Sequence, residues 1–283
     1  MVVLSSSTPR RLSSTAEIGY TADVNLNLKQ KVALVTGGSR GLGRAICLSL
    51  AAEGARVAVH YYRDPAKGID LAGEAAEVVG RIQAEYGVAA AAVPGDLARP
   101  SDIPAIFDTI EAELGQAEIL VNNAGIWPTA YVKDMTDGEW NATLAVNLTG
   151  PFLTCREAVR RWLAAGRPGS IVNIVSQAAF HGATSGHAHY AAAKAGVVAF
   201  TISLAREVAQ QGIRVNAVAP GMIATDMAHE ALQTNREGYL QRIPLGRVAD
   251  PAEVAGVVVF LASERAGYMT GATLDVTGGM LMR

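Results

Sequence analysis

The order of hydrophobic and polar positions divides most of the chain into short β-branched runs and longer amphipathic stretches, which alternate from residue 31 onward. The short runs predict buried strands at residues 32–36, 56–60, 89–93, 119–122, 171–176, 213–219 and 272–276. The longer stretches predict helices at residues 44–53, 70–86, 101–114, 136–165 and 190–210, with a further helix from residue 250. Seven strands joined by crossover helices predict an α/β fold: one doubly wound, seven-stranded parallel sheet with helices on both faces.

Two segments depart from this alternation. Residues 1–29 are rich in Ser, Thr and Arg and lack the apolar centre of a secretory signal. We therefore expect a flexible N-terminal tail, followed by a single catalytic domain at residues 30–283. Residues 222–245 interrupt the rhythm with a mixed, polar stretch that contains methionine.

The composition limits the classes of function. Hydrophobic residues make up 50% of the 283 residues and charged residues 18%, which is ample for a buried core. The net charge of −2 argues against a nucleic-acid partner, because binding phosphates needs a basic face. No window of about 18 uncharged apolar residues predicts a membrane span. Cys47 and Cys155 are expected to be reduced, buried thiols of a cytoplasmic protein, and no metal-ligand spacing is present.

Candidate chemistry lies in residues 176–194. Tyr190 and Lys194 are four residues apart, so a helix places them on one face. A positive charge close to a phenol lowers its pKa by roughly 1–3 units, which prepares it for general acid–base catalysis. Ser176 ends an apolar run and can donate a hydrogen bond where oxyanion charge develops. The three side chains suit hydride transfer to or from a carbonyl beside a nicotinamide, although a Tyr–Lys pair alone is also common on solvated helices.

A glycine-rich turn raises the weight of that hypothesis. Residues 36–43 read Thr-Gly-Gly-Ser-Arg-Gly-Leu-Gly and connect the first predicted strand to a helix. Glycines at 37, 41 and 43 let the backbone approach a pyrophosphate, which the N–H groups and dipole of the helix N-terminus attract. Although the spacing is G-x-x-x-G-x-G, its place between strand and helix predicts a dinucleotide site.

The end of the second predicted strand selects the cofactor in dinucleotide folds. An acid there binds the ribose hydroxyls of NAD and repels a 2′-phosphate, but residues 60–62 contain no acid. Arg40 and Arg63 can both meet a phosphate with planar donors. The pattern favours NADP(H), with NAD(H) as the alternative because Asp64 follows directly.

Six motifs, in order, resemble those of the short-chain dehydrogenase/reductase family over residues 30–281. They are TGGSRGLG at 36–43, Asp96-Leu97, NNAG at 122–125, Asn147, the Ser176, Tyr190 and Lys194 set, and residues 220–225. The chain is most similar to the bacterial 3-oxoacyl-(acyl-carrier-protein) reductase type, through HYAAAKAGV, IRVNAVAPG and residues 277–280. The resemblance implies a Rossmann domain in which Asp96-Leu97 holds adenine and residues 220–225 close over the nicotinamide carboxamide.

The resemblance also implies a catalytic tetrad of Asn147, Ser176, Tyr190 and Lys194. Ser176 and Tyr190 would bind the carbonyl oxygen, and Tyr190 would be the acid/base. Lys194 would lower the Tyr190 pKa and bind the nicotinamide ribose. Asn147 would hold a water. The cofactor-binding residues predicted by the turn and the resemblance are Thr36, Gly37, Ser39, Arg40, Gly41, Leu42, Gly43, Tyr61, Arg63, Asp96, Leu97, Asn123, Ala124, Gly125, Tyr190, Lys194, Pro220, Gly221, Ile223 and Thr225.

The function predicted is an NADP(H)-dependent oxidoreductase that interconverts a small-molecule carbonyl and a secondary alcohol, with a 3-oxoacyl thioester as one candidate substrate. The alternatives are an NAD(H)-dependent sugar, polyol or other alcohol dehydrogenase and, with less support, a non-catalytic nucleotide-binding regulator. The resemblance implies a homotetramer (or homodimer) and a lid at residues 222–245.

The separation of Ser176 and Tyr190 by 14 positions is one longer than the family spacing, which argues against acyl-carrier recognition. It enlarges the loop at residues 181–189 beside the predicted site. Candidates for lining a substrate pocket, or for ordinary loop packing, are Trp127, His181, His187, His189, Met222, Met227, His229 and Tyr239.

Overall fold

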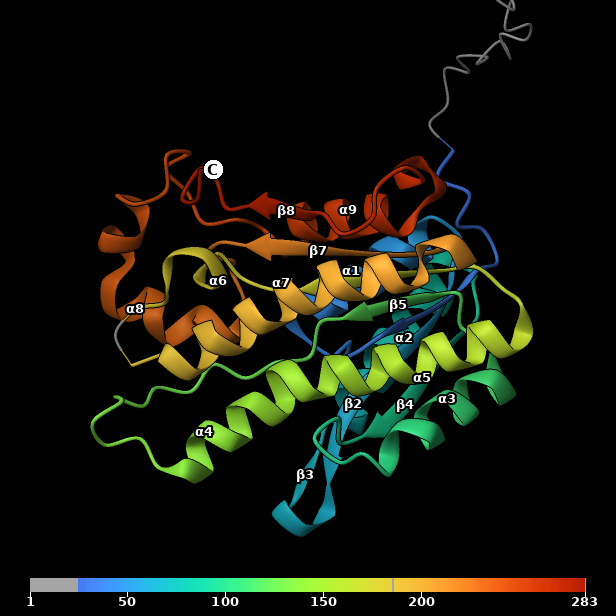
Figure 1. Ribbon diagram of the computed structural model, residues 1–283, viewed down its shortest axis with the longest axis horizontal. Coiled ribbons are helices and arrows are strands. Elements are labelled where there is room, and N and C mark those ends of the chain that lie inside the picture. The colour runs from blue at the N-terminus through green and yellow to red at the C-terminus, as the bar shows by residue number, and fades with distance from the viewer. Residues whose placement is uncertain (1–24, 185, 283) are drawn as a thin grey trace, which may run out of the picture.

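The computed structural model describes residues 25–184 and 186–282, so the expectations for residues 1–24 lie outside the described residues. Within those ranges eight strands form one sheet, with its parallel strands in the order β4-β2-β1-β5-β6-β7-β8 (Figure 1). They are β1 (Val32–Val35), β2 (Arg56–Asp64), β3 (Ile69–Asp70), β4 (Ala90–Gly95), β5 (Ile119–Asn122), β6 (Gly169–Ile174), β7 (Ile213–Pro220) and β8 (Thr273–Val276). The two-residue β3 pairs antiparallel with the end of β2. The predicted parallel sheet is confirmed, and β3 is an addition to it.

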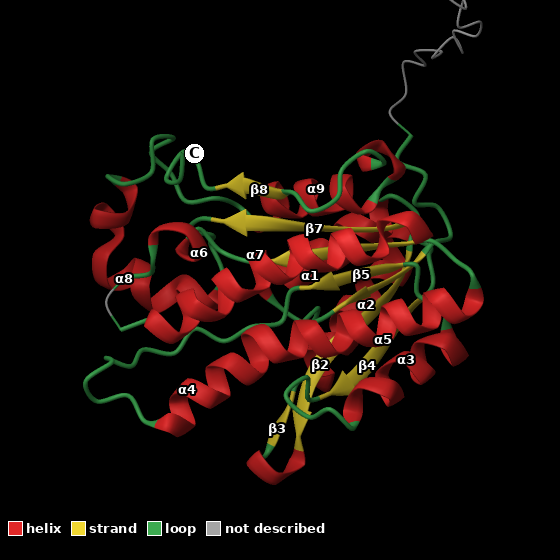
Figure 2. Cartoon of the chain, viewed as in Figure 1, coloured by secondary structure: helices red, strands yellow, loops and turns green. Residues whose placement is uncertain are grey.

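Helices cover both faces of the sheet (Figure 2). One face carries α1 (Gly41–Ala52), α2 (Ala72–Tyr86) and α9 (Pro251–Ala262). The other carries α3 (Asp102–Glu113), α5 (Gly150–Ala165) and α7 (Ala188–Val208). The layers are therefore those of a doubly wound α/β domain, as predicted.

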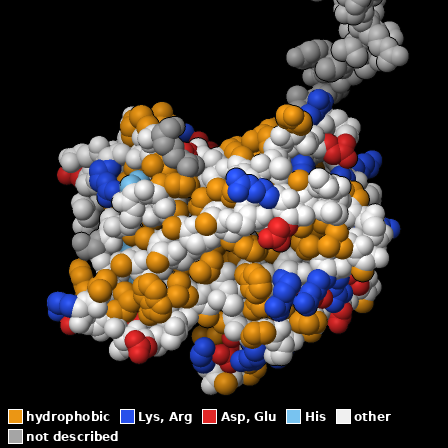
Figure 3. All heavy atoms as spheres, viewed as in Figure 1, with side chains coloured by type: hydrophobic (Ala, Val, Ile, Leu, Met, Phe, Trp, Pro, Cys, Tyr) orange, Lys and Arg blue, Asp and Glu red, His pale blue; other side chains and the backbone are white. Residues whose placement is uncertain are grey.

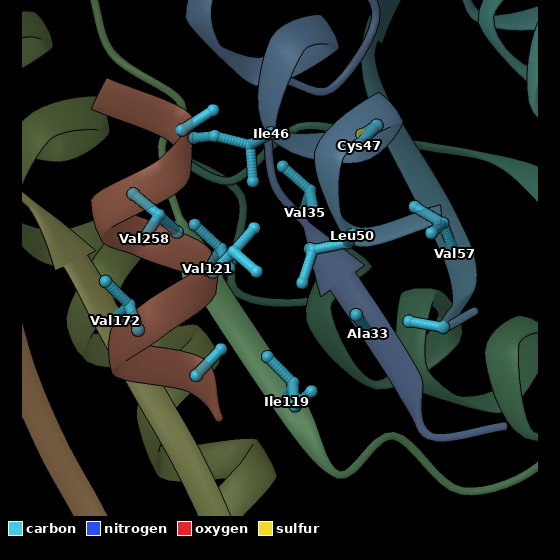
Figure 4. Close-up of a cluster of buried hydrophobic side chains, with 14 of the residues drawn as sticks. Ala33, Val35, Ile46, Cys47, Leu50, Val57, Ile119, Val121, Val172 and Val258 are labelled. Atoms are coloured by element: carbon cyan, nitrogen blue, oxygen red, sulfur yellow. The ribbon is translucent and has the colours of Figure 1, made fainter. Parts of the chain in front are cut away.

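The two cores explain the unbroken apolar strands of the sequence. Ala33 and Val35 belong to the core under α1 and α9, whereas the alternate residues Val32 and Leu34 belong to the opposite core. Figure 4 shows the first core, where side chains of α1 and α9 meet those of the central strands. Because a parallel strand in this position is buried on both faces, both sets of alternate residues are apolar.

The long helix predicted at residues 136–165 is present but interrupted. Its first part, α4 (Asp137–Leu144), begins at a capping box, in which the Thr136 hydroxyl accepts the Glu139 N–H at 3.2 Å. The Glu139 carboxylate accepts the Thr136 N–H at 2.8 Å, which completes the box. A π-helical turn (Ala145–Thr149) then joins α4 to α5 and contains the buried Asn147. Such turns are frequent at functional sites.

Several element boundaries differ from the predictions. Leu28 is buried in the first core, so the packed domain begins before residue 30. Strand β2 extends to residue 64 and forms a hairpin with β3, which delays the start of α2 to residue 72. A four-residue helix α6 (Ala178–His181) follows β6. Helix α8 (Asp226–Leu240) occupies most of the expected lid and is kinked at Asn235.

Among the described residues, one helix is long and apolar enough to cross a membrane by length and composition: α7 with the turn that follows it (Ala188–Gln211). Its buried residues include Leu204 and Val208, which belong to the core beneath the sheet. The helix also packs along β7. Its apolar character is therefore accounted for by its place in a covering layer of the sheet.

Candidate active site

A continuous cavity of about 1150 Å³ lies at the carboxyl ends of the parallel strands. Ligand sites of doubly wound sheets lie at this edge, because the loops that follow the strands converge there. The cavity extends from the glycine turn, past the loops after β4 and β5, to Ser176, Tyr190 and the lid helix α8. Its size accommodates a dinucleotide together with a small substrate.

The glycine turn is held open by its own backbone geometry. Gly37 has φ of +62°, a left-handed conformation that favours glycine. A Cβ added at Gly43 would lie 2.0 Å from the Gly37 carbonyl oxygen, so no larger residue fits the first turn of α1. Helix α1 begins there with no side-chain cap and no acid in its first turn. The N-terminus of α1 is therefore free to bind an anion through its N–H groups.

The loop after β5 braces this turn. The Thr36 hydroxyl accepts hydrogen bonds from the Asn123 N–H at 2.9 Å and the Ala124 N–H at 3.0 Å. In return the Asn123 side-chain amide donates to the carbonyl oxygens of Thr36 and Gly37. Thr36 itself does not line the cavity, so it positions the turn and does not face a ligand.

Tyr190 and Lys194 lie on one side of α7 and both line the cavity, as their spacing predicted. The Lys194 Nζ lies 5.8 Å from the centre of the Tyr190 ring and donates to the Ile174 carbonyl oxygen at 2.9 Å. Ser176, just beyond β6, faces the same space, and its Oγ accepts the Ala178 N–H at 3.1 Å. The structure therefore brings the three predicted side chains together.

Asn147 joins the same group from the π-helical turn. Its side-chain amide donates to the carbonyl oxygens of Ile126 and Thr143, both at 3.0 Å, and its Oδ1 accepts the Ile126 N–H at 3.2 Å. A Cβ added at Gly125 would lie 2.8 Å from the Asn147 Oδ1 and 3.7 Å from the Lys194 Nζ. Gly125 therefore leaves room for the Asn147 and Lys194 side chains to approach each other.

Burial governs the proton affinities at this end of the cavity. It raises the pKa of Tyr190 above its usual value, an effect that the hydrogen bond with Ser176 partly opposes. Burial lowers the pKa of Lys194 to about 8. The sequence predicted that Lys194 would lower the Tyr190 pKa; the net pKa is instead raised by burial, and the hydrogen bond with Ser176 is the effect that opposes it. The desolvation of the phenol is the larger effect, and the ammonium group hydrogen-bonds to Ile174 instead.

Most of the predicted cofactor residues line the cavity, and these are Gly37, Ser39, Arg40, Gly41, Leu42, Gly43, Asp96, Leu97, Asn123, Ala124, Gly125, Tyr190, Lys194, Pro220, Gly221, Ile223 and Thr225. Tyr61 and Arg63 do not, which corrects their assignment. Tyr61 is buried in the core with α2, and the Arg63 Nε pairs with Asp70 at 3.3 Å. Because side chains alternate along a strand, Tyr62 faces the cavity instead.

Lys67, in the turn between β2 and β3, is a cavity residue that the sequence did not reveal. Its Nζ pairs with Asp64 at 3.2 Å, and Asp64 also accepts from the Tyr62 hydroxyl at 3.1 Å. The hydrogen bond from Lys67 holds the pKa of Asp64 below its usual value. Asp64 is buried and does not line the cavity, so it does not take the position from which an acid binds ribose hydroxyls.

Of the residues that the sequence offered for lining a substrate pocket, some line the cavity and others do not. Those that line the cavity are Trp127, His181, Met222, Met227 and Tyr239, whereas His187, His189 and His229 do not. The structure adds Arg242 and Met280, from segments far apart in the sequence. The sequence did not assign either residue to the cavity, because only the folding of the chain brings them there.

Comparison with known proteins identifies the family. A short-chain dehydrogenase family model, described as enoyl-(acyl carrier protein) reductase, matches residues 37–281. The 3-oxoacyl-[acyl-carrier-protein] reductase FabG of Escherichia coli (strain K12) is 42% identical over 258 residues, 91% of this chain and 100% of that protein. The chain belongs to the short-chain dehydrogenase/reductase family.

Other members of this family support the assignment. FabG of Vibrio harveyi is 43% identical over 91% of this chain and 100% of its own length, and the 3-oxoacyl-[acyl-carrier-protein] reductase of Synechocystis sp. (strain ATCC 27184 / PCC 6803 / Kazusa) is 43% identical over 90% and 98%. The crystal structure of gox2181 superposes with a TM-score of 0.84 at 35% identity, covering 90% of this chain and 97% of that one. A dehydrogenase/reductase from Sinorhizobium meliloti 1021 gives 0.81 at 35% identity, covering 91% and 98%.

As a member of this family, the protein is an NAD(P)-dependent oxidoreductase. Its residues fit such a cofactor. The free N-terminus of α1 suits the pyrophosphate, and Gly37 and Gly43 leave the space for its close approach. The fit thus rests on donors and space at one end of the cavity and on Tyr190 and Lys194 at the other.

Proposed function

We propose that the protein is an NADP(H)-dependent reductase that converts a ketone to a secondary alcohol, with 3-oxoacyl thioesters among its substrates. The observation that carries the proposal is the convergence of Ser176, Tyr190, Lys194 and Asn147 at one end of a cavity whose other end is a phosphate-binding turn. The thioester substrate is supported by relatives named 3-oxoacyl-[acyl-carrier-protein] reductases.

In this proposal Ser176 and Tyr190 bind the substrate, and bound nicotinamide supplies the hydride for the carbonyl carbon. The Ser176 and Tyr190 hydroxyls donate hydrogen bonds to the carbonyl oxygen, where negative charge develops. The raised pKa of Tyr190 keeps the phenol protonated at neutral pH, which is the form required of an acid in the reductive direction. Tyr190 gives its proton to the forming alkoxide.

Lys194 and Asn147 then serve the return of the proton. With its pKa lowered to about 8, Lys194 can exchange protons near neutral pH more readily than an ordinary lysine. Asn147 is anchored through its side-chain amide to the backbone of Ile126 and Thr143, which fixes its position beside Lys194. We assign to Asn147 the holding of a water between Lys194 and solvent, and to Lys194 the binding of the nicotinamide ribose.

The preference for NADP(H) rests on the charges around the β2 end of the cavity. Arg40 and Lys67 both line it, and Asp64 is turned away and paired with Lys67. A 2′-phosphate would meet two cations there, and the acid at the end of β2, Asp64, is already paired. We expect kcat/KM for NADPH to exceed that for NADH by at least about tenfold, a difference of 1.4 kcal/mol.

The Tyr190→Phe variant tests the catalytic assignment. Loss of the general acid should lower kcat for acetoacetyl-thioester reduction by about 10²–10⁴-fold, while the Kd for NADPH changes little. Tyr86→Phe, at the exposed end of α2, is the matched control and should keep the wild-type rate. A Tyr190→Phe enzyme that retained more than a tenth of the rate would overturn the proposal.

We further expect a homotetramer in the cytoplasm. Exposed apolar side chains, including Trp140 on α4, Phe152 and Leu163 on α5 and Ile202 on α7, lie on the helices of one face. Figure 3 shows hydrophobic side chains spread over that face. Exposed apolar side chains that gather on one face are typical of contacts between subunits. Light scattering coupled to gel filtration measures the assembly, and a monomer at micromolar concentration would contradict it.

A further inference from the structure

Trp127 forms an aromatic wall beside the catalytic tyrosine. Its indole lines the cavity, and its centre lies 6.5 Å from that of the Tyr190 ring, with the two ring planes inclined by 59°. The neighbouring Ile126 and Pro128 also line the cavity, and neither side chain carries a hydrogen-bonding group. The wall next to the reacting position is therefore flat and apolar.

His187 supports this wall from outside the cavity. Its imidazole stacks on the Trp127 ring, with centres 4.4 Å apart and planes inclined by 23°, and it is itself buried. The His187 Nδ1 lies 2.9 Å from the Pro128 carbonyl oxygen. Because a carbonyl can only accept, Nδ1 carries the proton. The stack and the hydrogen bond together fix the orientation of the Trp127 indole.

The segments that carry these two side chains are joined to each other. The Ala130 N–H donates to the Gly186 carbonyl oxygen at 2.8 Å. Gly186 has φ of +85°, and a Cβ there would lie 2.7 Å from the Thr129 side chain, so the two loops make a close contact that only glycine allows. The loop before Tyr190 thus holds Trp127 in place and is more than a spacer.

We propose that Trp127 is a platform for a planar, conjugated or aromatic substituent on the carbonyl carbon of the substrate, and that His187 is its positioning residue. This inference rests on the proposed function and narrows its substrate class to ketones with a flat apolar group next to the carbonyl. Offset stacking on an indole is worth about two- to tenfold in affinity beyond the buried area, which a saturated group of equal size does not gain. The three methionines that line the same cavity, Met222, Met227 and Met280, can adapt to such a group.

The test compares three ketones in NADPH-dependent reduction: ethyl benzoylacetate, its 3-cyclohexyl analogue and ethyl acetoacetate. Each reaction consumes one ketone, one NADPH and one proton and yields one alcohol and one NADP⁺. Trp127→Leu keeps apolar bulk but removes the flat face, and Trp127→Phe keeps a flat face. We expect Trp127→Leu to lower kcat/KM about tenfold for the phenyl substrate and no more than about threefold for the other two. Trp127→Phe should stay within about threefold for all three.

The His187 variants separate positioning from catalysis. His187→Ala should raise KM for ethyl benzoylacetate about three- to tenfold and leave kcat within twofold, because Tyr190 is untouched. His187→Phe keeps the stack and should restore KM. If His187→Ala lowered kcat by the same factor for ethyl acetoacetate and for ethyl benzoylacetate, His187 would act on Tyr190. That result would overturn its assigned positioning role.

The platform is overturned if Trp127→Leu lowers kcat/KM by the same factor for the phenyl and the cyclohexyl substrate, or lowers it for neither. A separate measurement keeps the outcome distinct from that of the proposed function. Acetophenone should quench tryptophan fluorescence saturably in the wild type. The saturable part of the quenching should be absent in Trp127→Phe. If the wild type reduces none of the ketones, the reductase proposal fails while the titration still decides the platform. Quenching without saturation counts against the platform.

Discussion

The two ends of the cavity are built in different ways. At the cofactor end, glycines and backbone N–H groups at the start of α1 form the surface, and the Asn123 amide holds them in place. At the substrate end, side chains from separate loops and the lid helix meet, among them Trp127, Met222 and Arg242. Backbone surfaces tolerate little change, whereas side-chain surfaces can be altered to suit a different substrate. Mutations at the two ends should therefore differ in kind.

At the cofactor end the largest effect is expected from Gly43→Ala. The added Cβ would lie 2.0 Å from the Gly37 carbonyl oxygen, so the turn must move. We expect the Kd for NADPH to rise at least about 100-fold, or 2.7 kcal/mol. Gly80→Ala in α2 is the control, because a Cβ there meets nothing within 4 Å. Calorimetric titration measures both, and a Gly43→Ala protein with wild-type affinity would contradict the backbone account.

Lys194→Met should trade activity for stability. Burial lowers the folded-state pKa of Lys194 to about 8, below its ordinary value of 10.5. The charged amine is therefore unfavourable in the folded protein below pH 8, and that penalty disappears as the pH rises toward 10.5. Lys194→Met removes this penalty, although the Ile174 carbonyl loses its hydrogen-bond donor. The difference is a net gain of about 1–3 kcal/mol in unfolding free energy at pH 7. Urea titrations at pH 7 and 10.5 measure it.

The sign of that pH dependence is the decisive part. Between pH 8 and 10.5 the unfolded chain binds more protons at Lys194 than the folded protein, so the wild type gains stability relative to the variant as the pH rises. An advantage of Lys194→Met that grew with pH would contradict the lowered pKa.

Lys67→Ala tests the charged border of the cofactor end. Removing a cation that lines the cavity should raise KM for NADPH about tenfold, because a charge-assisted hydrogen bond to phosphate is lost. KM for NADH should change less than about twofold, since it has no 2′-phosphate. Lys133→Ala is the control, because Lys133 does not line the cavity and pairs with exposed Asp134. Equal changes for both cofactors would remove Lys67 from the 2′-phosphate site.

The smallest effect is expected from Thr136→Ala, which removes the cap of α4. Loss of the capping box should lower the unfolding free energy by about 1 kcal/mol and Tm by a few degrees. Ketone reduction should be unchanged at 25 °C, because the cap lies a full helix away from Asn147. Thr109→Ala is the matched control, because the Thr109 hydroxyl donates to the Ala105 carbonyl within α3 and caps no helix. A large loss of activity would show that α4 transmits strain to the π-helical turn.

The sequence predicted the sheet because its signals are local. Both faces of each central strand are buried, so strands such as β1 and β5 appear as unbroken apolar runs, and the Thr136 and Asp250 capping boxes mark helix starts. The hairpin of β3 was missed because two residues carry too little pattern. The π-helical turn was missed because its residues are those of any helix.

The site residues were likewise predicted where the signal was local and missed where it was not. Tyr190 and Lys194 were found because one helical turn relates them, and glycines 37, 41 and 43 because one loop contains them. The placement of Tyr61 and Arg63 was wrong even though the alternation from Val57 and Val59 would have turned both away from the cavity. Lys67 and Arg242 had no pattern at all, and Met280 belonged to a motif of the resemblance that gave it no place at the cavity.

The sequence by itself determined the order of strands and helices, the glycine turn and the Tyr190–Lys194 pair, because each depends on neighbours within a few positions, whereas Asn147 was assigned from the family resemblance. Only the tertiary structure decided which side chains face the cavity, that burial raises the pKa of Tyr190, and that His187 stacks on Trp127. Burial and stacking depend on contacts between residues far apart in the chain, and those contacts exist only once the sheet has closed its layers around them.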